Sequence, residues 1–282
     1  MTSTDPLQDS PFTAEDVAVA VRLLTRELSE PVTELITLTD EELLAVEGLQ
    51  KEQITPLPWA SANISDGAPK EAATATAMRS LMARGLVTTE AALDPRAFEQ
   101  DPQRSNRFVS VPELQGTSVA RRTADAVVIT ERITDRGSAR SYFYVFRLDE
   151  GVRVLWEVFD DMGFHLFFLM EGDTFPEQLL GFVDPEGVIG GQDGDPVEVP
   201  GADFELSETG QRLAQSRAAT SVLVLERDGA DPMAMSLFAL PDHVELMESV
   251  EADGGELRRV GPVAKTTLMQ FLQGIVAGPE AA

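Results

Sequence analysis

The residues best suited to chemistry in this sequence lie together at positions 160–165, Asp-Asp-Met-Gly-Phe-His. Two carboxylates and an imidazole could ligate a metal ion or transfer protons. The segment also separates two runs rich in Val, Leu and Phe, a pattern typical of two strands joined by a tight turn, with Gly163 supplying a positive φ. Because neighbouring strand residues face opposite sides of a sheet, Asp160, Asp161 and His165 lack ligand spacing. We interpret the segment as a hairpin corner, and expect glutamine in place of His165 to leave the fold intact.

Other catalytic patterns are missing from the sequence. His165 and His243 are the two histidines, they form no His-x-x-Glu pattern, and there is no cysteine for thiol catalysis or metal binding. No G-x-S-x-G, P-loop or G-x-G-x-x-G is present, and the glycine-rich run 187–194 is acidic, with no lysine to hold phosphate. The sequence therefore predicts a protein that is not an enzyme and needs no metal or other cofactor.

The charge balance narrows the classes of partner. The 282 residues carry a formal charge of −26, which disfavours a phosphate backbone as partner. Hydrophobic residues make up 43% of the chain, enough for a folded core. No apolar run approaches the ~20 residues that span a bilayer, and the first residues show no secretory signal. We expect a cytoplasmic protein without a nucleic-acid or membrane partner.

Periodicity predicts helices in the first third of the chain and strands beyond it. Helices are expected at 13–30, 40–47, 70–85, 90–99, 175–183 and 265–277, and strands at 34–38, 127–134, 140–148, 152–159, 163–170, 220–227, 233–240, 243–250 and 256–260. Thr39 with Glu42, and Thr174 with Glu177, are expected to form capping boxes. We divide the chain into a disordered leader 1–11, an N-terminal half 12–183, an acidic Gly/Pro-rich loop 184–203 and a C-terminal half 204–282, the two halves forming one integrated domain.

The two strand-rich stretches resemble each other. Residues 127–143 align without a gap on 222–238, which places Ser141 on Ser236, and further along Gly163 falls on Gly255. Each stretch has four strands followed by a helix. The sequence thus predicts an α+β fold in which two ββββα repeats build one quasi-twofold antiparallel sheet, flanked by helical bundles.

Three segments carry a resemblance to a known family. They are ITLTDEELLAVEGL at 36–49, Pro-Leu-Pro at 56–58, and AMRSLMARGLV at 77–87, which contains Leu-x-x-Arg-Gly-Leu. With the strand repeat that follows, the chain resembles the EspG family of chaperones of type VII (ESX) secretion in actinobacteria over roughly residues 33–278. The resemblance implies a cytosolic chaperone that binds helical secretion substrates such as PE–PPE heterodimers. It also implies that the partner contacts the central sheet and a loop between two strands.

In this sequence that loop corresponds to Thr134, Asp135, Arg136, Gly137 and Ser138, which are the candidate partner-binding residues. The N-terminal helix and the acidic loop depart from the family pattern, so the class of cargo stays open. Two alternatives remain. One is a regulatory protein with a winged helix at residues 70–95, whose predicted helix has little basic surface. The other is an interaction module that shares the fold but binds a different partner.

Overall fold

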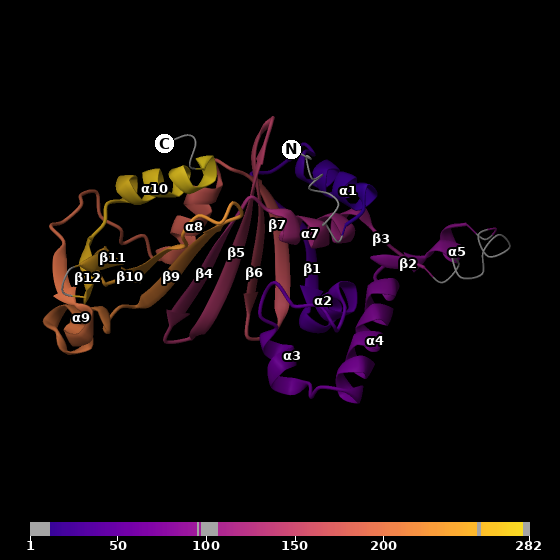
Figure 1. Cartoon of the computed structure of the whole chain (residues 1–282), viewed down its shortest axis with the longest axis horizontal. Coiled ribbons are helices and arrows are strands. Elements are labelled where there is room, and N and C mark those ends of the chain that lie inside the picture. The colour runs from indigo at the N-terminus through magenta and orange to yellow at the C-terminus, as the bar shows by residue number, and fades with distance from the viewer. Residues whose placement is uncertain (1–11, 95, 97–106, 253–254, 279–282) are drawn as a thin grey trace, which may run out of the picture. The chain divides into compact units, whose positions relative to one another are not determined.

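The predicted α+β fold is present as a ten-stranded antiparallel sheet with associated helices (Figure 1). The computed structural model describes residues 12–94, 96, 107–252 and 255–278, so the predicted leader 1–11 lies outside the described residues. The strands run across the sheet in the order β1 (Val32–Thr39), β7 (Phe164–Glu171), β6 (Gly151–Asp160), β5 (Gly137–Leu148), β4 (Ala126–Thr134), β9 (Ala218–Glu226), β10 (Met233–Ala239), β11 (Val244–Ala252), β12 (Gly255–Pro262) and β8 (Val197–Pro200).

The helices and a small second sheet complete the secondary structure. The helices are α1 (Ala14–Leu24), α2 (Asp40–Glu47), α3 (Pro58–Asn63), α4 (Ala68–Ala83), α5 (Glu90–Leu93), α7 (Pro112–Thr123), α8 (Phe175–Val183), the 3-10 helix η2 (Gly201–Leu206), α9 (Glu208–Leu213) and α10 (Lys265–Ala277). Strands β2 (Val87–Thr89) and β3 (Phe108–Ser110) pair antiparallel. Within the described residues, no helix is long and apolar enough to cross a membrane.

The chain divides into two compact units. Unit 1 contains Met1–Leu28, Glu34–Thr123 and Phe159–Phe168, and unit 2 contains Ser29–Thr33, Ala124–Val158 and Leu169–Ala282. Unit 1 therefore holds the helices from α1 to α7, and unit 2 holds α8, α9, α10 and most strands of the large sheet.

In unit 1, helix α1 packs closely on α7. A Cβ built on Gly116 would lie 2.9 Å from Leu23 Cδ2 and 3.1 Å from Leu23 Cβ, so a larger residue would have to displace the Leu23 side chain. Thr13 and Asp16 form a capping box at the start of α1, and Asp16 accepts a 2.7 Å hydrogen bond from Gln115 of α7. The sequence predicted this helix to residue 30, but it ends at Leu24, because Thr25 closes the last turn.

Helices α2 and α4 of unit 1 are joined through one buried carboxylate. Thr39 and Glu42 form the predicted capping box, and Glu42 is 2% exposed. Its carboxylate also accepts hydrogen bonds from Ser80 at 2.8 Å and from Arg84 at 2.5 Å. Lys70 of α4 is likewise paired, with Asp66 at 3.2 Å. Two of the three cations of the 70–85 segment are thus engaged within the protein, which weakens the winged-helix alternative.

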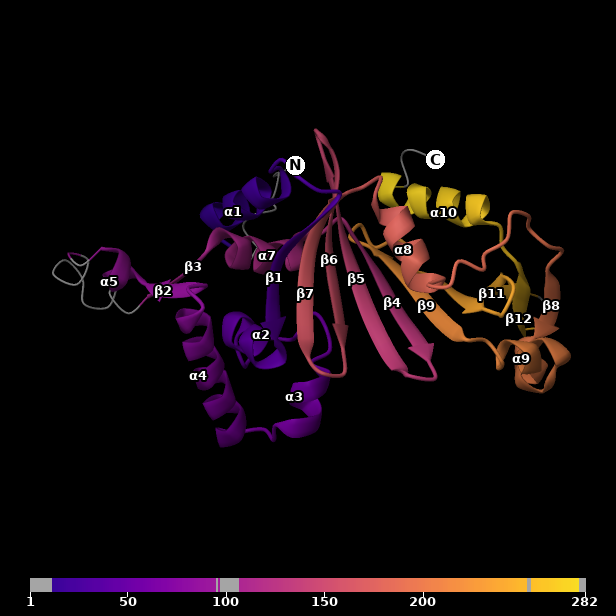
Figure 2. The same ribbon diagram turned by 180° about the vertical axis from the view of Figure 1, so that it is seen from behind.

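In unit 2, helices α8 and α10 cover one face of the sheet (Figure 2). Their apolar side chains form a single core with the inward residues of β4, β5, β9 and β10, among them Val128, Val222 and Leu237. Phe143 lies at the centre of this core, with its ring 5.0 Å from Phe175 and 5.7 Å from Trp156. Burial of each such aromatic side chain stabilises the fold by about 1.5–3 kcal/mol.

The element order of the predicted repeat is present in both stretches, four strands followed by α8 or α10. The gapless alignment is wrong in register, however. In the hairpin of β4 and β5, Thr130 lies opposite Ser141. The alignment therefore predicts that Leu225 lies opposite Ser236 in the hairpin of β9 and β10. In the structure, Ser236 lies opposite Ser221. The second hairpin has a longer turn than the first, and a repeat with equivalent positions stays a prediction.

Two local predictions from sequence are also wrong. Thr174 does not cap α8, because its backbone is helical and its side chain accepts no hydrogen bond from the first turn. The segment 184–203, expected to be a loop throughout, contains β8 and the start of η2. The strand forms because Val199 is buried and residues 197–200 pair with 257–260 of β12.

Candidate protein-binding site

The residues with the most evident chemistry, at 160–165, form the predicted hairpin corner. Gly163 has a φ of +71°, and an added Cβ would lie 2.6 Å from Trp59 Cβ. His165 is fully buried, stacks on Phe159 at 4.4 Å, and its Nε2 lies 2.8 Å from Asp40 Oδ1. His165 therefore has a buried hydrogen-bond partner that its spacing in the sequence did not indicate, and tolerance of glutamine no longer follows from the lack of ligand spacing. The pair is a structural contact sealed from solvent.

Both carboxylate oxygens and the backbone N–H of Asp40 form hydrogen bonds within unit 1. Its Oδ2 accepts a 2.9 Å hydrogen bond from the Ala60 backbone, and its own backbone N–H donates to the Gly163 carbonyl at 2.9 Å. Asp40 thus links the start of α2 to α3 and to the β6–β7 corner. In the part of the chain that the structure describes, no group of three or more His, Asp and Glu side chains could hold a metal ion.

The five predicted partner-binding residues lie together in the turn between β4 and β5. The Thr134 hydroxyl accepts a 3.2 Å hydrogen bond from the Arg136 backbone and donates to the Gly137 carbonyl at 3.2 Å. Gly137 has a φ of +133°, a conformation that favours glycine. These bonds fix the backbone of the turn, while the side chains of Asp135 and Arg136 remain exposed. We call residues 134–138 the β4–β5 turn.

Beside this turn, one face of β4 and β9 presents apolar side chains that are only partly buried. Val127 lies opposite Leu225, Ile129 opposite Leu223, and Ile133 opposite Ala219. Ile133 is 56% exposed and Leu225 is 36% exposed. These six residues, which we call the open face, alternate with the side chains that pack beneath α8 and α10. The polar pair of Glu131 and Ser221 lies on the same side, between Ile129 and Ile133.

The open face ends in an apolar hollow of about 570 Å³ beside the β4–β5 turn. Ile133, Ala219 and Phe238 form the part of its wall that comes from the sheet, and Phe204 and Leu213 form the part from η2 and α9. Asp135 and Arg217 also line it, so charged groups border an apolar floor. Apolar pockets with a few polar groups are typical of binding sites.

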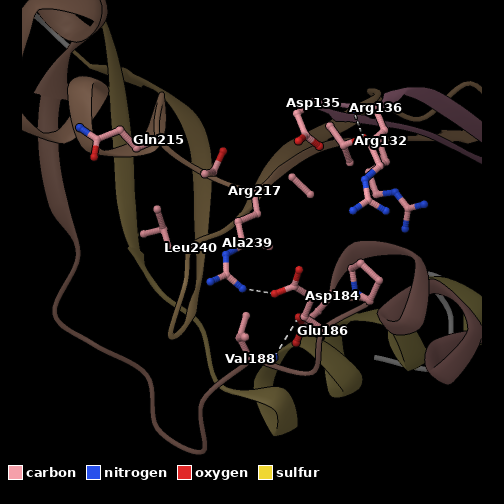
Figure 3. A pocket seen from close by; sticks show the side chains of 14 residues that line it. Arg132, Asp135, Arg136, Asp184, Glu186, Val188, Gln215, Arg217, Ala239 and Leu240 are labelled. Carbon is pink, nitrogen blue, oxygen red and sulfur yellow. Dashed lines mark hydrogen bonds and ion pairs between the residues drawn. The ribbon is translucent and has the colours of Figure 1, made fainter.

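A second hollow, of about 780 Å³, is lined by Arg132 and Ala218, the strand neighbours of Ile133 and Ala219, and therefore lies on the opposite face of β4 and β9. Figure 3 shows this hollow from close by. Arg132 and Arg136 lie on one side of it, and Arg217, in an ion pair with Glu186, lies across from them. We call it the arginine pocket. Arg132 stacks over the Phe182 ring at 4.7 Å, and its Nη1 donates to the Phe182 carbonyl at 2.8 Å. Burial lowers the pKa of Arg132, because it removes water from the guanidinium.

Sequence reasoning located the turn but missed the open face and both hollows. The apolar alternation of Val127, Ile129 and Ile133, and of Leu223 and Leu225, was a usable signal for the face. The hollows had no such signal, because each combines residues from segments far apart in the chain.

In the turn between β10 and β11, His243 takes part in a polar cluster. Its Nδ1 lies 2.7 Å from Asp242 and its Nε2 lies 3.3 Å from Glu245, which also accepts a 2.9 Å hydrogen bond from Arg212. Burial lowers the pKa of His243, but the hydrogen bonds to Asp242 and Glu245 outweigh it, so the pKa is raised above 6.5. The cluster fixes α9 against β11, next to the apolar hollow.

This cluster should make stability depend on pH. Because the folded-state pKa of His243 is raised, protonated His243 contributes stability fully below about pH 6.5 and loses it as the pH rises through the folded-state value. We expect His243→Gln to be less stable than wild type near pH 5.5 and equal to it near pH 8.5, by urea unfolding. A Gln215→Ala control, exposed and uncharged, should show a difference that does not change with pH. A constant deficit for His243→Gln would contradict the assignment.

Comparison with known proteins gives one solved structure of interest. No protein-family model matches the sequence, and no curated protein matches it significantly. The type VII secretion system chaperone EspG5 of Mycobacterium tuberculosis, solved in complex with the PE25–PPE41 dimer, is similar with a TM-score of 0.49 at 10% identity. The similarity covers 86% of this chain and 95% of the EspG5 chain.

Proposed function

We propose that this protein is a cytosolic, non-catalytic chaperone or adaptor that binds helical secretion substrates of a type VII system. The observation that carries the proposal is the open face, which leads into an apolar hollow beside a rigid, exposed turn. Surfaces of this kind bind protein better than small polar substrates. The resemblance of residues 36–49, 56–58 and 77–87 to the EspG family supports the kind of cargo, PE–PPE-like helical proteins.

The open face and the β4–β5 turn contribute in different ways to the free energy of binding. A partner helix laid on the open face gains about 25 cal/mol per Å² of apolar surface removed from water. Full burial of an aliphatic side chain is worth about 1.5–3 kcal/mol, and Ile133 and Leu225, which are 56% and 36% exposed, can each contribute the exposed part of that amount. Asp135 and Arg136 are charged and exposed, so they set orientation and partner choice more than affinity.

The test is co-expression of this protein with the small helical proteins encoded beside its gene. We expect wild type to co-purify with one of them, and Ile133→Glu to reduce the affinity by at least about tenfold, because a charge then replaces an apolar contact. The charge-conserving double change Asp135→Arg with Arg136→Asp should alter which partner is preferred. Affinities are measured by isothermal titration after purification.

Met162→Glu provides the matched control. Met162 is 63% exposed in the β6–β7 turn, so the change adds the same charge to a comparably exposed apolar residue. It should bind as wild type does. Failure of wild type to co-purify with any of the encoded helical proteins would overturn the proposal. Equal binding by Ile133→Glu and wild type would remove the open face from it.

A further inference from the structure

The arginine pocket holds two guanidinium groups that the fold leaves without a counter-charge. Among the described residues, no carboxylate forms an ion pair with Arg132 or Arg136, although Asp184, Asp135 and Glu186 line the same pocket. Asp184 instead accepts hydrogen bonds from the Val188 and Ile189 backbones at 3.0 and 2.7 Å. The nearby acids are therefore occupied or turned elsewhere, which is unusual in a chain of charge −26.

Arg132 shows a second sign of a missing partner. Its Nε is buried and has no hydrogen-bond partner among the described residues, although its Nη1 is bonded to the Phe182 carbonyl. A buried donor without an acceptor costs free energy, more so when the group is charged. Figure 3 shows the Arg132 and Arg136 guanidinium groups on the same side of the pocket. Two adjacent cations also repel one another, and one anion between them would relieve that repulsion.

The geometry points to a carboxylate as the occupant: we infer that the arginine pocket receives the side chain of a single Asp or Glu from the bound protein partner. Guanidinium groups bind carboxylates through paired, charge-assisted hydrogen bonds. The overall charge of −26 repels a polyanion such as a nucleic acid, whereas one carboxylate on an otherwise apolar segment meets little repulsion. Pocket walls of Val188, Ala239 and Leu240 suit the apolar neighbours of such a residue.

This inference rests on the proposed function, because it assigns one contact of the proposed partner. The β4–β5 turn separates the two hollows, and Thr134, Asp135, Ser216 and Arg217 line both. A partner that contacts the turn can therefore place an apolar side chain in the hollow on one face and a carboxylate in the arginine pocket on the other.

The test uses the full chain and does not need the natural partner. Nuclear magnetic resonance follows the Nε–Hε signal of Arg132, assigned with Arg132→Lys, while the blocked tripeptide acetyl-Leu-Glu-Leu-amide is added. We expect a saturable shift of this signal. Acetyl-Leu-Gln-Leu-amide should bind at least about tenfold more weakly, since its neutral amide makes no charge-assisted bond. Arg136→Gln should weaken binding of the Glu peptide similarly.

Arg153→Gln is the matched control, because Arg153 pairs with Glu171 at 3.3 Å on another part of unit 2. It should leave the titration unchanged. An equal response to the Glu and Gln peptides would overturn the inference in favour of an apolar pocket. Tighter binding of inorganic phosphate than of the Glu peptide would overturn it in favour of a phosphate site. The peptides replace the cargo, so this titration does not depend on the co-expression test. A failed co-expression contradicts the proposed function, whereas a failed titration contradicts the carboxylate site in the arginine pocket.

Discussion

Replacing Asp40 by alanine should destabilise the folded protein by about 3–5 kcal/mol. Asp40 and His165 are both fully buried, and the change leaves His165 Nε2 and the Ala60 N–H without their acceptor. Water cannot reach either group to replace the lost bonds. Urea unfolding followed by circular dichroism measures the change as a lower midpoint.

Two further variants define the cause of this loss. Asp40→Asn keeps the shape and one carbonyl acceptor, so it should cost clearly less than the alanine change if hydrogen bonding dominates over charge. Glu52→Ala removes an exposed carboxylate from unit 1 and should leave the midpoint nearly unchanged. If Asp40→Ala loses no more stability than Glu52→Ala, the buried pair of Asp40 and His165 contributes no measurable free energy to folding.

Replacing Glu47 by leucine should also destabilise unit 1 by about 3–5 kcal/mol. Glu47 is 6% exposed and forms ion pairs with Arg121 and Arg122 of α7. Arg121 is 4% exposed, donates to Thr55 at 2.6 Å and lies 5.5 Å over the Phe167 ring. Loss of Glu47 therefore removes a counter-charge from the buried Arg121 guanidinium, and urea unfolding detects the cost.

The double change Glu47→Leu with Arg121→Met should recover most of this loss. It replaces the buried ion pair by apolar side chains of similar length, an exchange that is often neutral or stabilising. Arg122 can turn toward water, because its side chain is 26% exposed. Glu113→Ala, which removes the long 3.8 Å pair with Arg26, is the surface control and should have little effect. A double variant less stable than the single one would contradict this account.

The sequence predicted the central strands well because their residues alternate and are rich in Val, Ile, Tyr and Phe. Helix α7 was missed because its sequence, PELQGTSVARRT, contains Gly116 and two β-branched threonines, which are poor helix formers. The helix is stabilised instead by its packing against Leu23 of α1. Strand β8 was missed because prolines and glycines surround it, and only pairing with β12 makes it a strand. In both cases tertiary contacts override local preference.

The candidate site was predictable only in part, for a similar reason. The β4–β5 turn follows from two long strands and the glycine between them, so residues 134–138 could be located from sequence. The sequence did not indicate that Arg132 lines a pocket, because its contact with Phe182 joins positions 50 residues apart. His165 and Asp40 are 125 residues apart in the chain, so their spacing gave no indication that they pair in the core.

Strand β8 bears on how readily one edge of the large sheet could pair with another copy of the chain. A sheet whose last strand is long and flat can add another copy edge to edge and grow into a fibril. Here β12, with eight residues, is covered by β8, which has only four, of which Pro200 cannot donate a backbone hydrogen bond. Glu198 adds negative charge on this border, paired with Arg259 at 3.1 Å. The acidic segment 184–203 thus makes the β8 edge of the sheet a poor template for another copy, whereas the opposite edge is the eight-residue strand β1.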